Sequence, residues 1–341
     1  MMNKTFRKGI SILAVAGMLA GCLAAGGVNV MAEDAGELVL YSPAPEEILS
    51  TIVQEFQDKT GIEVELIQAG SGELLTRIKS ESNNPMADVI YGCGAEAAES
   101  FKEYFTPYES PEAANVKEEF KSTDGSWTGA YVSPTIIMYN KDLVPEDEVP
   151  AGWEDLADEK WKGQLAFADP AISGSSFTTM AILLSAMDNG DGGWDYIRKY
   201  VAALDGNILN SSGAPVKGVA DGEYAMCITQ EQAALEYILA GADNVGIVYP
   251  EEGTATIPSS VSIVKDGPNT ENAKKFVDFV LSSEVQQKLT EFRHHMVRTD
   301  LEETGDFAPL SEIKMTDFDF MKASEEKDNY MKQWNDIVIG K

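Results

Sequence analysis

The chain has 341 residues, a formal net charge of −30 at pH 7 and only three cysteines. This length exceeds one typical domain of about 150 residues, so two domains are expected. The strong negative charge argues against nucleic acid and anionic membranes as partners, and three cysteines are too few for a disulfide framework.

The N-terminal sequence predicts a secretory signal peptide. The basic start MMNKTFRKG is followed by ISILAVAGMLAGCLAAGGVNVMA, with no acidic residue before Glu33. Its glycines and Asn29 argue against a permanent membrane anchor. The segment LAGC (19–22) resembles a bacterial lipobox, which would remove residues 1–21 and leave Cys22 lipidated, whereas small residues before Glu33 also allow ordinary cleavage after residues 1–32. Either cleavage predicts an extracytoplasmic protein, periplasmic or held at the cell surface as a lipoprotein.

The first half of the mature chain alternates strands and helices with short loops. The expected elements in order are ELVLYSP (37–43, strand), EEILSTIVQEFQDKTG (46–61, helix), IEVELIQ (62–68, strand), ELLTRIKSE (73–81, helix) and ADVIYGCG (87–94, strand). Such alternation is typical of a parallel α/β sheet. Ligands of these sheets bind outside the carboxyl ends of the strands.

The same alternation recurs further along the chain. The expected elements are QLAFADP (164–170, strand), SGSSFTTMAILLSAM (173–187, helix), GEYAMCI (222–228, strand), NVGIVYP (244–250, extended), TIPSSVSIVK (256–265, extended) and NAKKFVDFVLSSEVQQKL (272–289, helix). Between the two halves, WEDLADEKWKG (153–163) predicts a polar surface helix and turn. The final SEEKDNYMKQWNDIVIGK (324–341) predicts an amphipathic helix packed on one domain.

Several motifs together carry a family resemblance. They are YSPAPEE, GSGELLTRIKSE, ADVIYGCG, WEDLADEKWKGQLAFADP, SSGAPVKGVADGEYAMCIT, YPEEGT and NAKKFVDFVLSSEVQ before VR, in this order between residues 37 and 300. In these the chain resembles the extracellular solute-binding proteins of ABC importers, in the branch that binds iron(III), 2-aminoethylphosphonate or sugar phosphates.

The resemblance implies an α/β, two-lobe, periplasmic-binding-protein-like clamshell of type II, with mixed, mainly parallel sheets. The chain would cross between lobes twice, near residues 131–140 and 256–264. Lobe 1 would then hold residues 37–131 and 256–300, and lobe 2 residues 132–255 and 301–341. The resemblance further implies a monomer without cofactor or catalytic residues, whose partners are a small anionic ligand and the importer's membrane permease.

Serines and glycines recur where the expected strands end and helices begin. A helix N-terminus offers unpaired N–H groups and partial positive charge, and serine adds a hydroxyl donor. Several such ends in one cleft would bind a phosphate-like anion, although each serine alone could be an ordinary helix cap. The candidate residues of this kind are Ser42, Ser71, Gly72, Cys93, Ser173, Gly174, Ser175, Ser176, Ser211, Ser212 and Gly213.

Polar residues following the strand at 222–228 form the second candidate group. In iron-binding members of the family, two adjacent tyrosines ligate Fe(III) at the places of Gln230 and Glu231. We expect Thr229, Gln230 and Glu231 to bind ligand hydroxyls or an ammonium instead, with Glu252 as a second acceptor, although both acids could also face water at helix starts. The resemblance adds Arg298 near the cleft.

These patterns predict a protein that captures a sugar phosphate or aminoalkylphosphonate by hinge closure. The alternatives are an Fe(III)-binding protein and, more remotely, a secreted phosphoesterase. No nucleophile with a base and no metal-ligand cluster can be assembled from the spacing, and His294 and His295 are the only histidines. We therefore expect a binding protein that is not an enzyme, with no metal site of its own.

Overall fold

A computed structural model describes residues 36–340 except 189, 305 and 306. The described residues belong to one compact unit, Ala35–Lys341. The expected signal segment, both cleavage positions and Cys22 lie outside the described residues. Within the described part of the chain, no helix is long and apolar enough to cross a membrane.

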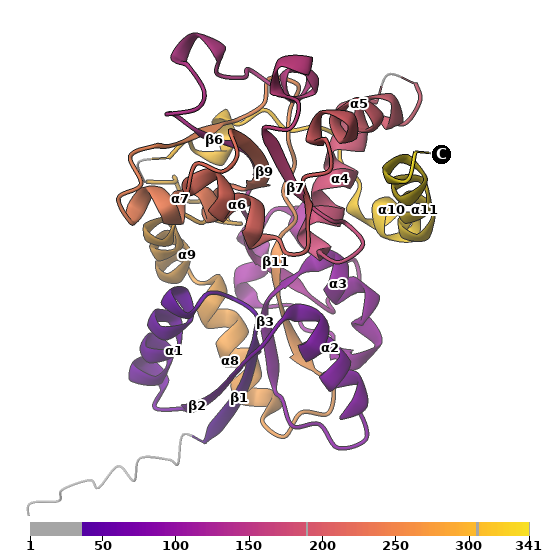
Figure 1. Ribbon diagram of the computed structural model, residues 1–341. Coiled ribbons are helices and arrows are strands. Elements are labelled where there is room, and N and C mark those ends of the chain that lie inside the picture. Colours follow the sequence, from indigo (N-terminus) through magenta and orange to yellow (C-terminus); the bar gives the residue numbers. More distant parts are fainter. Residues whose placement is uncertain (1–35, 189, 305–306, 341) are drawn as a thin grey trace, which may run out of the picture. The chain divides into compact units, whose positions relative to one another are not determined.

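The unit contains two separate β-sheets (Figure 1). The first sheet has the order β2-β1-β3-β11-β4, with β5 also paired to β11. Its strands are β1 (Glu37–Ser42), β2 (Glu63–Gln68), β3 (Val89–Gly94), β4 (Phe105–Thr106), β5 (Thr128–Tyr131) and β11 (Ser259–Val264). The helices connected with it are α1 (Glu46–Thr60), α2 (Ser71–Ser80), α3 (Ala95–Ser100), α8 (Thr270–Leu281) and α9 (Ser283–Leu289). We call this part the first lobe.

Side-chain alternation along the strands gives the first sheet two buried faces. Leu38 and Leu40 of β1 belong to one hydrophobic cluster with α1 and α8, whereas Tyr41 belongs to a second cluster with α2 and α3. In β3 this alternation is interrupted, because Tyr91 and Cys93 lie in different clusters. Gly92 between them has φ +90° and stands opposite a register shift in β11. This irregularity lets β3 turn its last side chains before α3.

The second sheet has the order β10-β6-β9-β7-β8. Its strands are β6 (Thr135–Asn140), β7 (Leu165–Ala168), β8 (Ile208–Leu209), β9 (Met226–Gln230) and β10 (Val245–Val248). The helices α4 (Gly174–Ala186), α5 (Trp194–Leu204), α6 (Gly213–Ala220) and α7 (Glu231–Leu239) pack around it. Helix α4 is apolar on nearly all sides because it is buried between the sheet and α5, as expected for a core helix. We call this part the second lobe.

Both sheets are mixed, but they are less parallel than the sequence predicts. Every antiparallel pairing in the first sheet involves β11, and every one in the second sheet involves β6. These are the strands by which the chain enters a sheet from the other lobe. A strand that arrives from the opposite side runs against its neighbours, so the crossings themselves make the sheets mixed.

Two connections join the lobes. Residues 132–134 link β5 to β6, within the predicted stretch 131–140, whereas residues 249–258 link β10 to β11 and begin before the predicted stretch 256–264. Pro134 of the first connection pairs with Thr256 of the second. Val132 of the first connection also pairs with His295, which comes later in the chain. The lobes therefore meet at a small bundle of extended segments rather than at one flexible link.

The segment at 153–163 differs from expectation in its secondary structure, and the chain after residue 300 differs in contacting both lobes, although its last helix forms as expected. The predicted polar surface helix at 153–163 consists of two 3-10 turns, and Trp153 and Trp161 are 0% and 4% exposed, because both tryptophans turn into the core of the second lobe. The C-terminal segment forms α10 (Phe320–Glu325) and α11 (Lys327–Val338), and Trp334 of α11 is buried against Phe167. Leu310, which precedes these helices, packs instead in the first lobe. Residues 301–341 therefore contact both cores.

Candidate functional site

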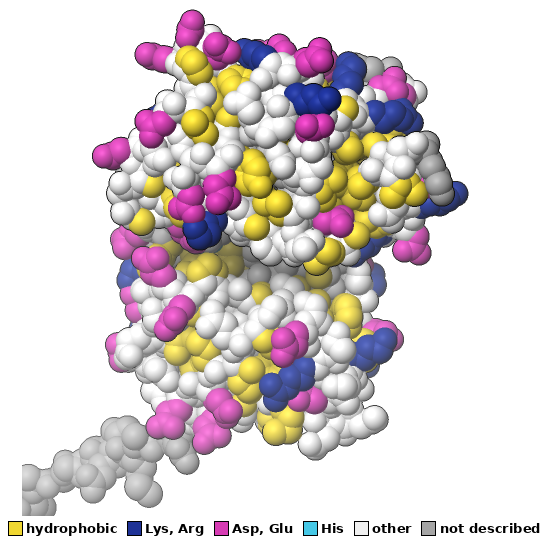
Figure 2. Space-filling model, viewed as in Figure 1, with side chains coloured by type: hydrophobic (Ala, Val, Ile, Leu, Met, Phe, Trp, Pro, Cys, Tyr) yellow, Lys and Arg dark blue, Asp and Glu magenta, His cyan; other side chains and the backbone are white. Residues whose placement is uncertain are grey.

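A cavity of about 260 Å³ opens in the second lobe at the ends of β7 and β9. Its walls come from these strands and from α4, α6 and α7. Figure 2 shows the hollow that crosses this face of the molecule between the elements of the two lobes. The sequence-predicted residues that line the cavity are Ser175, Ser176, Ser212, Gly213, Thr229 and Gln230.

The start of α4 forms one wall. Ser173 is the helix cap, and its Oγ accepts a hydrogen bond from the Ser176 N–H at 3.3 Å. The hydroxyls of Ser175 and Ser176 each lie 3.1 Å from the same Oγ. Ser173 is thus the ordinary cap that the sequence left as an alternative, while Ser175 and Ser176 face the cavity. Gly174, between Ser173 and Ser175, leaves open space where a side chain would stand.

The start of α6 forms a second wall. Ser212 has helical backbone angles and its side chain does not cap the helix, so its hydroxyl can turn toward the cavity. Gly213 has no atom within 4 Å of its missing side chain, which lets a ligand approach the backbone closely. Ser211 is exposed and lies outside the cavity lining. Two helix N-termini therefore converge on one space whose lining includes no lysine or arginine.

Helix α7 supplies a third wall through Ala233, Glu236 and Tyr237. Desolvation at this wall raises the pKa of Glu236, and the hydrogen bond from Gln232 partly offsets this by lowering it. The carboxylate of Glu47, on α1 of the first lobe, raises the pKa of Glu236 further. Sequence reasoning missed Glu236 and Tyr237 as site residues. Their spacing of three and four residues from Ala233 places all three on one helix face, and this signal could have found them.

Glu231 does not line the cavity, contrary to expectation. Its side chain is fully buried, with Oε2 2.7 Å from His295 Nε2 and Oε1 accepting a hydrogen bond from the Tyr249 hydroxyl. Thr229 and Gln230 end β9 and line the cavity, whereas Glu231 is the first residue of α7 and its side chain is turned to Tyr249 and His295. The acid expected to bind ligand is instead held by side chains near the lobe crossings.

Glu252 is also engaged elsewhere. Its two carboxylate oxygens accept hydrogen bonds from the backbone N–H groups of Trp153 and Glu154, each at 2.9 Å. These bonds fix the first 3-10 turn of the second lobe. The predicted role of Glu252 as a second ligand acceptor has no support in this arrangement, because both of its oxygens serve the turn.

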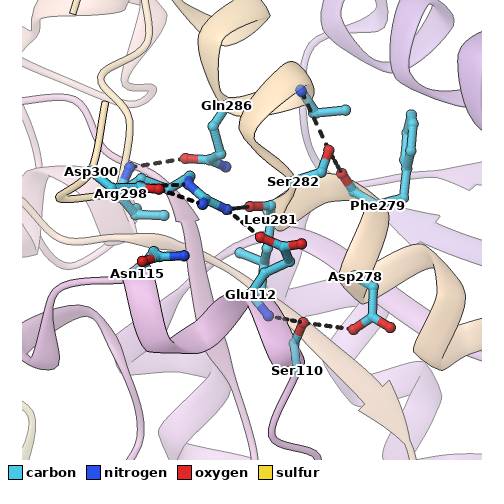
Figure 3. Close-up of polar contacts among 12 residues, drawn as sticks. Ser110, Glu112, Asn115, Asp278, Phe279, Leu281, Ser282, Gln286, Arg298 and Asp300 are labelled. Carbon is cyan, nitrogen blue, oxygen red and sulfur yellow. Dashed lines mark hydrogen bonds and ion pairs between the residues drawn. The ribbon is translucent and has the colours of Figure 1, made fainter. Parts of the chain in front are cut away.

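Arg298 lies in a cluster of hydrogen bonds and ion pairs in the first lobe (Figure 3). Its guanidinium donates to both oxygens of Asp300 at 2.9 and 2.8 Å, to Glu112, and to the backbone oxygen of Leu281 at 2.8 Å. The hydrogen bonds to Asp300 lead the effects that raise the pKa of Arg298. With its side chain 4% exposed, Arg298 ties three segments together and does not face the cavity, contrary to expectation.

The first-lobe candidates divide in the same way. Ser42 is fully buried and donates to the Tyr91 backbone oxygen at 2.6 Å, so its hydroxyl belongs to the interior. Ser71 and Gly72 begin α2 and remain accessible. The Cys93 thiol is buried beside the Ser71 hydroxyl, and burial raises the pKa of Cys93 to about 12. Neither Ser71 nor Cys93 lines the cavity of the second lobe.

The arrangement offers little to a bare metal ion. Within the described part of the chain, no group of three or more histidine, cysteine, aspartate or glutamate side chains could hold one. Tyr237 is the single tyrosine in the cavity lining, and Glu231 is already bonded on both oxygens. A hard cation such as Fe(III) needs several anionic oxygens, and the cavity presents only Glu236 and Tyr237.

Comparison with known proteins gives consistent matches. A family described as "Bacterial extracellular solute-binding protein" matches residues 84–324. The chain is 31% identical to iron uptake protein A1 of Synechocystis over 75% of this chain and 74% of that one. It is 25% identical to a putative 2-aminoethylphosphonate-binding periplasmic protein of Salmonella paratyphi A over 83% and 81%. The periplasmic binding protein AfuA of Actinobacillus pleuropneumoniae, solved with exogenous fructose-6-phosphate bound, superposes with TM-score 0.77 and 27% identity over 89% of this chain and 98% of that one.

Proposed function

Because the chain belongs to the bacterial extracellular solute-binding proteins, we propose that its cavity captures a small organic phosphate or phosphonate for an ABC importer. The matches confirm the family resemblance and the α/β two-lobe fold expected from the sequence. The protein is a periplasmic or extracellular binding protein and not an enzyme, and an ABC-importer permease is its partner.

One observation carries the ligand class: the starts of α4 and α6 meet in one cavity. The N–H groups at these helix starts other than that of Ser176, which Ser173 caps, and the hydroxyls of Ser175 and Ser212 suit the oxygens of a phosphate or phosphonate group. Glu236 and Tyr237 of α7 line the same cavity and suit the hydroxyls or ammonium at the other end of the ligand. The site is therefore bipolar, as expected from the sequence, but Glu236 takes the place assigned to Glu231.

The volume and placement agree with this ligand class. A cavity of about 260 Å³ lies just below the usual range for drug-sized ligands and suits a phosphorylated monosaccharide or a smaller phosphonate. All of its lining belongs to the second lobe. Closure about the two crossings would bring the accessible start of α2, with Ser71 and Gly72, toward the bound ligand, and ligand contacts with both lobes would favour the closed state.

A thermal-shift and calorimetry panel tests the proposal. The compounds are fructose 6-phosphate, glucose 6-phosphate, 2-aminoethylphosphonate, inorganic phosphate and ferric citrate, each against the unliganded protein. We expect saturable stabilisation and binding by at least one organic phosphate or phosphonate. Stabilisation by ferric citrate alone would contradict the proposal and favour the iron-binding alternative, which the name of the Synechocystis relative keeps in view.

A cavity-filling variant locates the site. Gly213→Val places a branched side chain in the open space at the start of α6, where no protein atom obstructs it. It should weaken binding of the best compound at least tenfold with little loss of stability. The matched control is Ala202→Val on the exposed face of α5, which should leave affinity unchanged. Equal affinities for the wild type and Gly213→Val would show that the ligand binds elsewhere.

A further inference from the structure

A buried chain of polar side chains lies where the lobes cross. Tyr249 donates to Glu231, Glu231 contacts His295 Nε2 at 2.7 Å, and His295 Nδ1 lies 3.0 Å from Glu303. Glu303 also accepts the N–H groups of Met296 and Leu310, at 3.0 and 2.6 Å. The side chains of Glu231 and His295 are both 0% exposed. This set joins the start of α7 to the segment that follows α9, far apart in the sequence.

The geometry sets the charge of His295. Each of its ring nitrogens faces a carboxylate oxygen. Ionised carboxylates only accept hydrogen bonds, and a neutral imidazole donates from one nitrogen only, so both contacts are satisfied when His295 is an imidazolium. Its neighbour His294 behaves oppositely: its Nδ1 lies 2.8 Å from the Phe292 backbone oxygen, and burial lowers the pKa of His294 to about 4.

Among the described residues, the other side chain in direct contact with the His295 ring is Phe307, which lies edge-on with the ring centroids 4.9 Å apart. The guanidinium of Arg293 lies 6.0 Å from the centroid of the same Phe307 ring. Tyr249 reaches His295 only through Glu231. The imidazolium is therefore balanced by the two acids, one on α7 and one on the chain after α9.

The same residues hold the first crossing from two sides. Val132 and His295 exchange backbone hydrogen bonds in both directions at 3.0 Å. On the other side, Glu231 N–H donates to the Pro134 oxygen at 2.8 Å and Gln232 N–H to Ser133 Oγ at 3.1 Å. The Glu231–His295 contact closes this ring around residues 132–134. A rotation of the crossing must either carry α7 with it or break the contact.

Helix α7 is also the cavity wall that carries Glu236 and Tyr237. A buried ion pair contributes little net stability compared with apolar residues of the same size, but breaking it by removing one partner is costly, so the Glu231–His295 contact resists separation of α7 from the crossing. We propose that Glu231 and His295 are positioning residues, which clamp the cavity wall of α7 to the first lobe crossing and so couple ligand affinity to hinge position. Only the affinity measurements that test this proposal depend on the proposed function.

Three substitutions separate this role from plain stability. His295→Gln and Glu231→Gln break the contact on α7, whereas Glu303→Gln removes the acid on the other side of the same imidazole and leaves α7 in contact. We expect the first two to weaken binding of the best panel compound at least tenfold, and Glu303→Gln to change affinity less than threefold even where it lowers the melting temperature. Equal affinity losses in all three would overturn the proposal.

A distance measurement reads the hinge without any ligand. Spin labels at Lys79→Cys on α2 and Lys199→Cys on α5, both exposed, report the separation of the lobes. The background is Cys22→Ser, and Cys93 and Cys227 are buried against labelling. We expect His295→Gln to broaden or shift the distance distribution of the unliganded protein. An unchanged distribution would refute the clamp, whichever compounds bind.

The pH dependence supplies a further readout, in which His295 itself is unchanged. Burial by itself lowers the pKa of His295, but the contacts with Glu231 and Glu303 overcome this and raise it to about 9. In the wild type, the distance distribution and the affinity should therefore change as pH rises through about 9, while His295→Gln should show neither change. A wild type that is flat over this range would contradict the proposal even if the variants failed to fold.

Discussion

Replacing Arg298 by methionine tests whether this arginine serves the fold or the ligand. The change keeps much of the side-chain volume and removes the charge. It leaves the carboxylates of Glu112 and Asp300 and the Leu281 backbone oxygen without their shared donor. Removing one partner of a buried ion pair costs about 3–5 kcal/mol. Glu112 and Asp300 are 36% and 41% exposed, so water compensates part of this.

The expected loss of unfolding free energy is therefore about 2–4 kcal/mol, including about 1 kcal/mol for the unpaired Leu281 oxygen. Urea titration followed by circular dichroism measures it. The matched control is Arg198→Met, since the ion pair of Arg198 with Asp195 is 55% and 77% exposed and should contribute less than about 1 kcal/mol.

Affinity decides between the two interpretations of Arg298. Because its guanidinium makes four hydrogen bonds inside the first lobe and lies outside the cavity lining, Arg298→Met should leave the ligand dissociation constant within about threefold at a temperature where the variant is folded. A variant of unchanged stability that no longer binds ligand would refute this reasoning, and would restore the role that the sequence suggested.

Three further predictions concern buried groups. The pKa of His295 is raised from 6.5 to about 9, so its protonation contributes about 3 kcal/mol to the free energy of unfolding. This contribution is complete below pH ~6.5 and is lost as pH rises through about 9. Urea titrations at pH 6 and 10 should show the loss in the wild type but not in His295→Gln. Burial raises the pKa of the Cys93 thiol to about 12 and that of the Cys227 thiol well above its usual value, so both should react with a thiol reagent at pH 8 only on unfolding, and rapid labelling of the native protein would contradict their burial. Trp334→Ala should destabilise the second lobe by about 3–5 kcal/mol in the same urea assay, and a loss below 1 kcal/mol would show that α11 is not packed there.

The local pattern of the sequence was sufficient for many of the helices and strands and for part of the cavity lining. The spacing of Ile48, Leu49, Ile52, Val53 and Phe56 predicts α1; four of these side chains are buried, and Val53 is partly buried against the same core. Serine and glycine at the starts of α4 and α6 pointed to residues that line two walls of the cavity, because a helix start carries its donors whatever surrounds it. Both signals depend on residues close together in the chain.

Only the tertiary structure decided which polar side chains line the cavity and which serve the fold. Glu231 and Glu236 lie on the same short helix, yet Glu231 is covered by Tyr249 and His295, and Glu236 lines the cavity. Arg298 is likewise satisfied by partners that the fold brings from elsewhere in the chain. A charged side chain is buried only where distant residues supply opposite charge and hydrogen bonds, and those partners are not visible from its own neighbours in sequence.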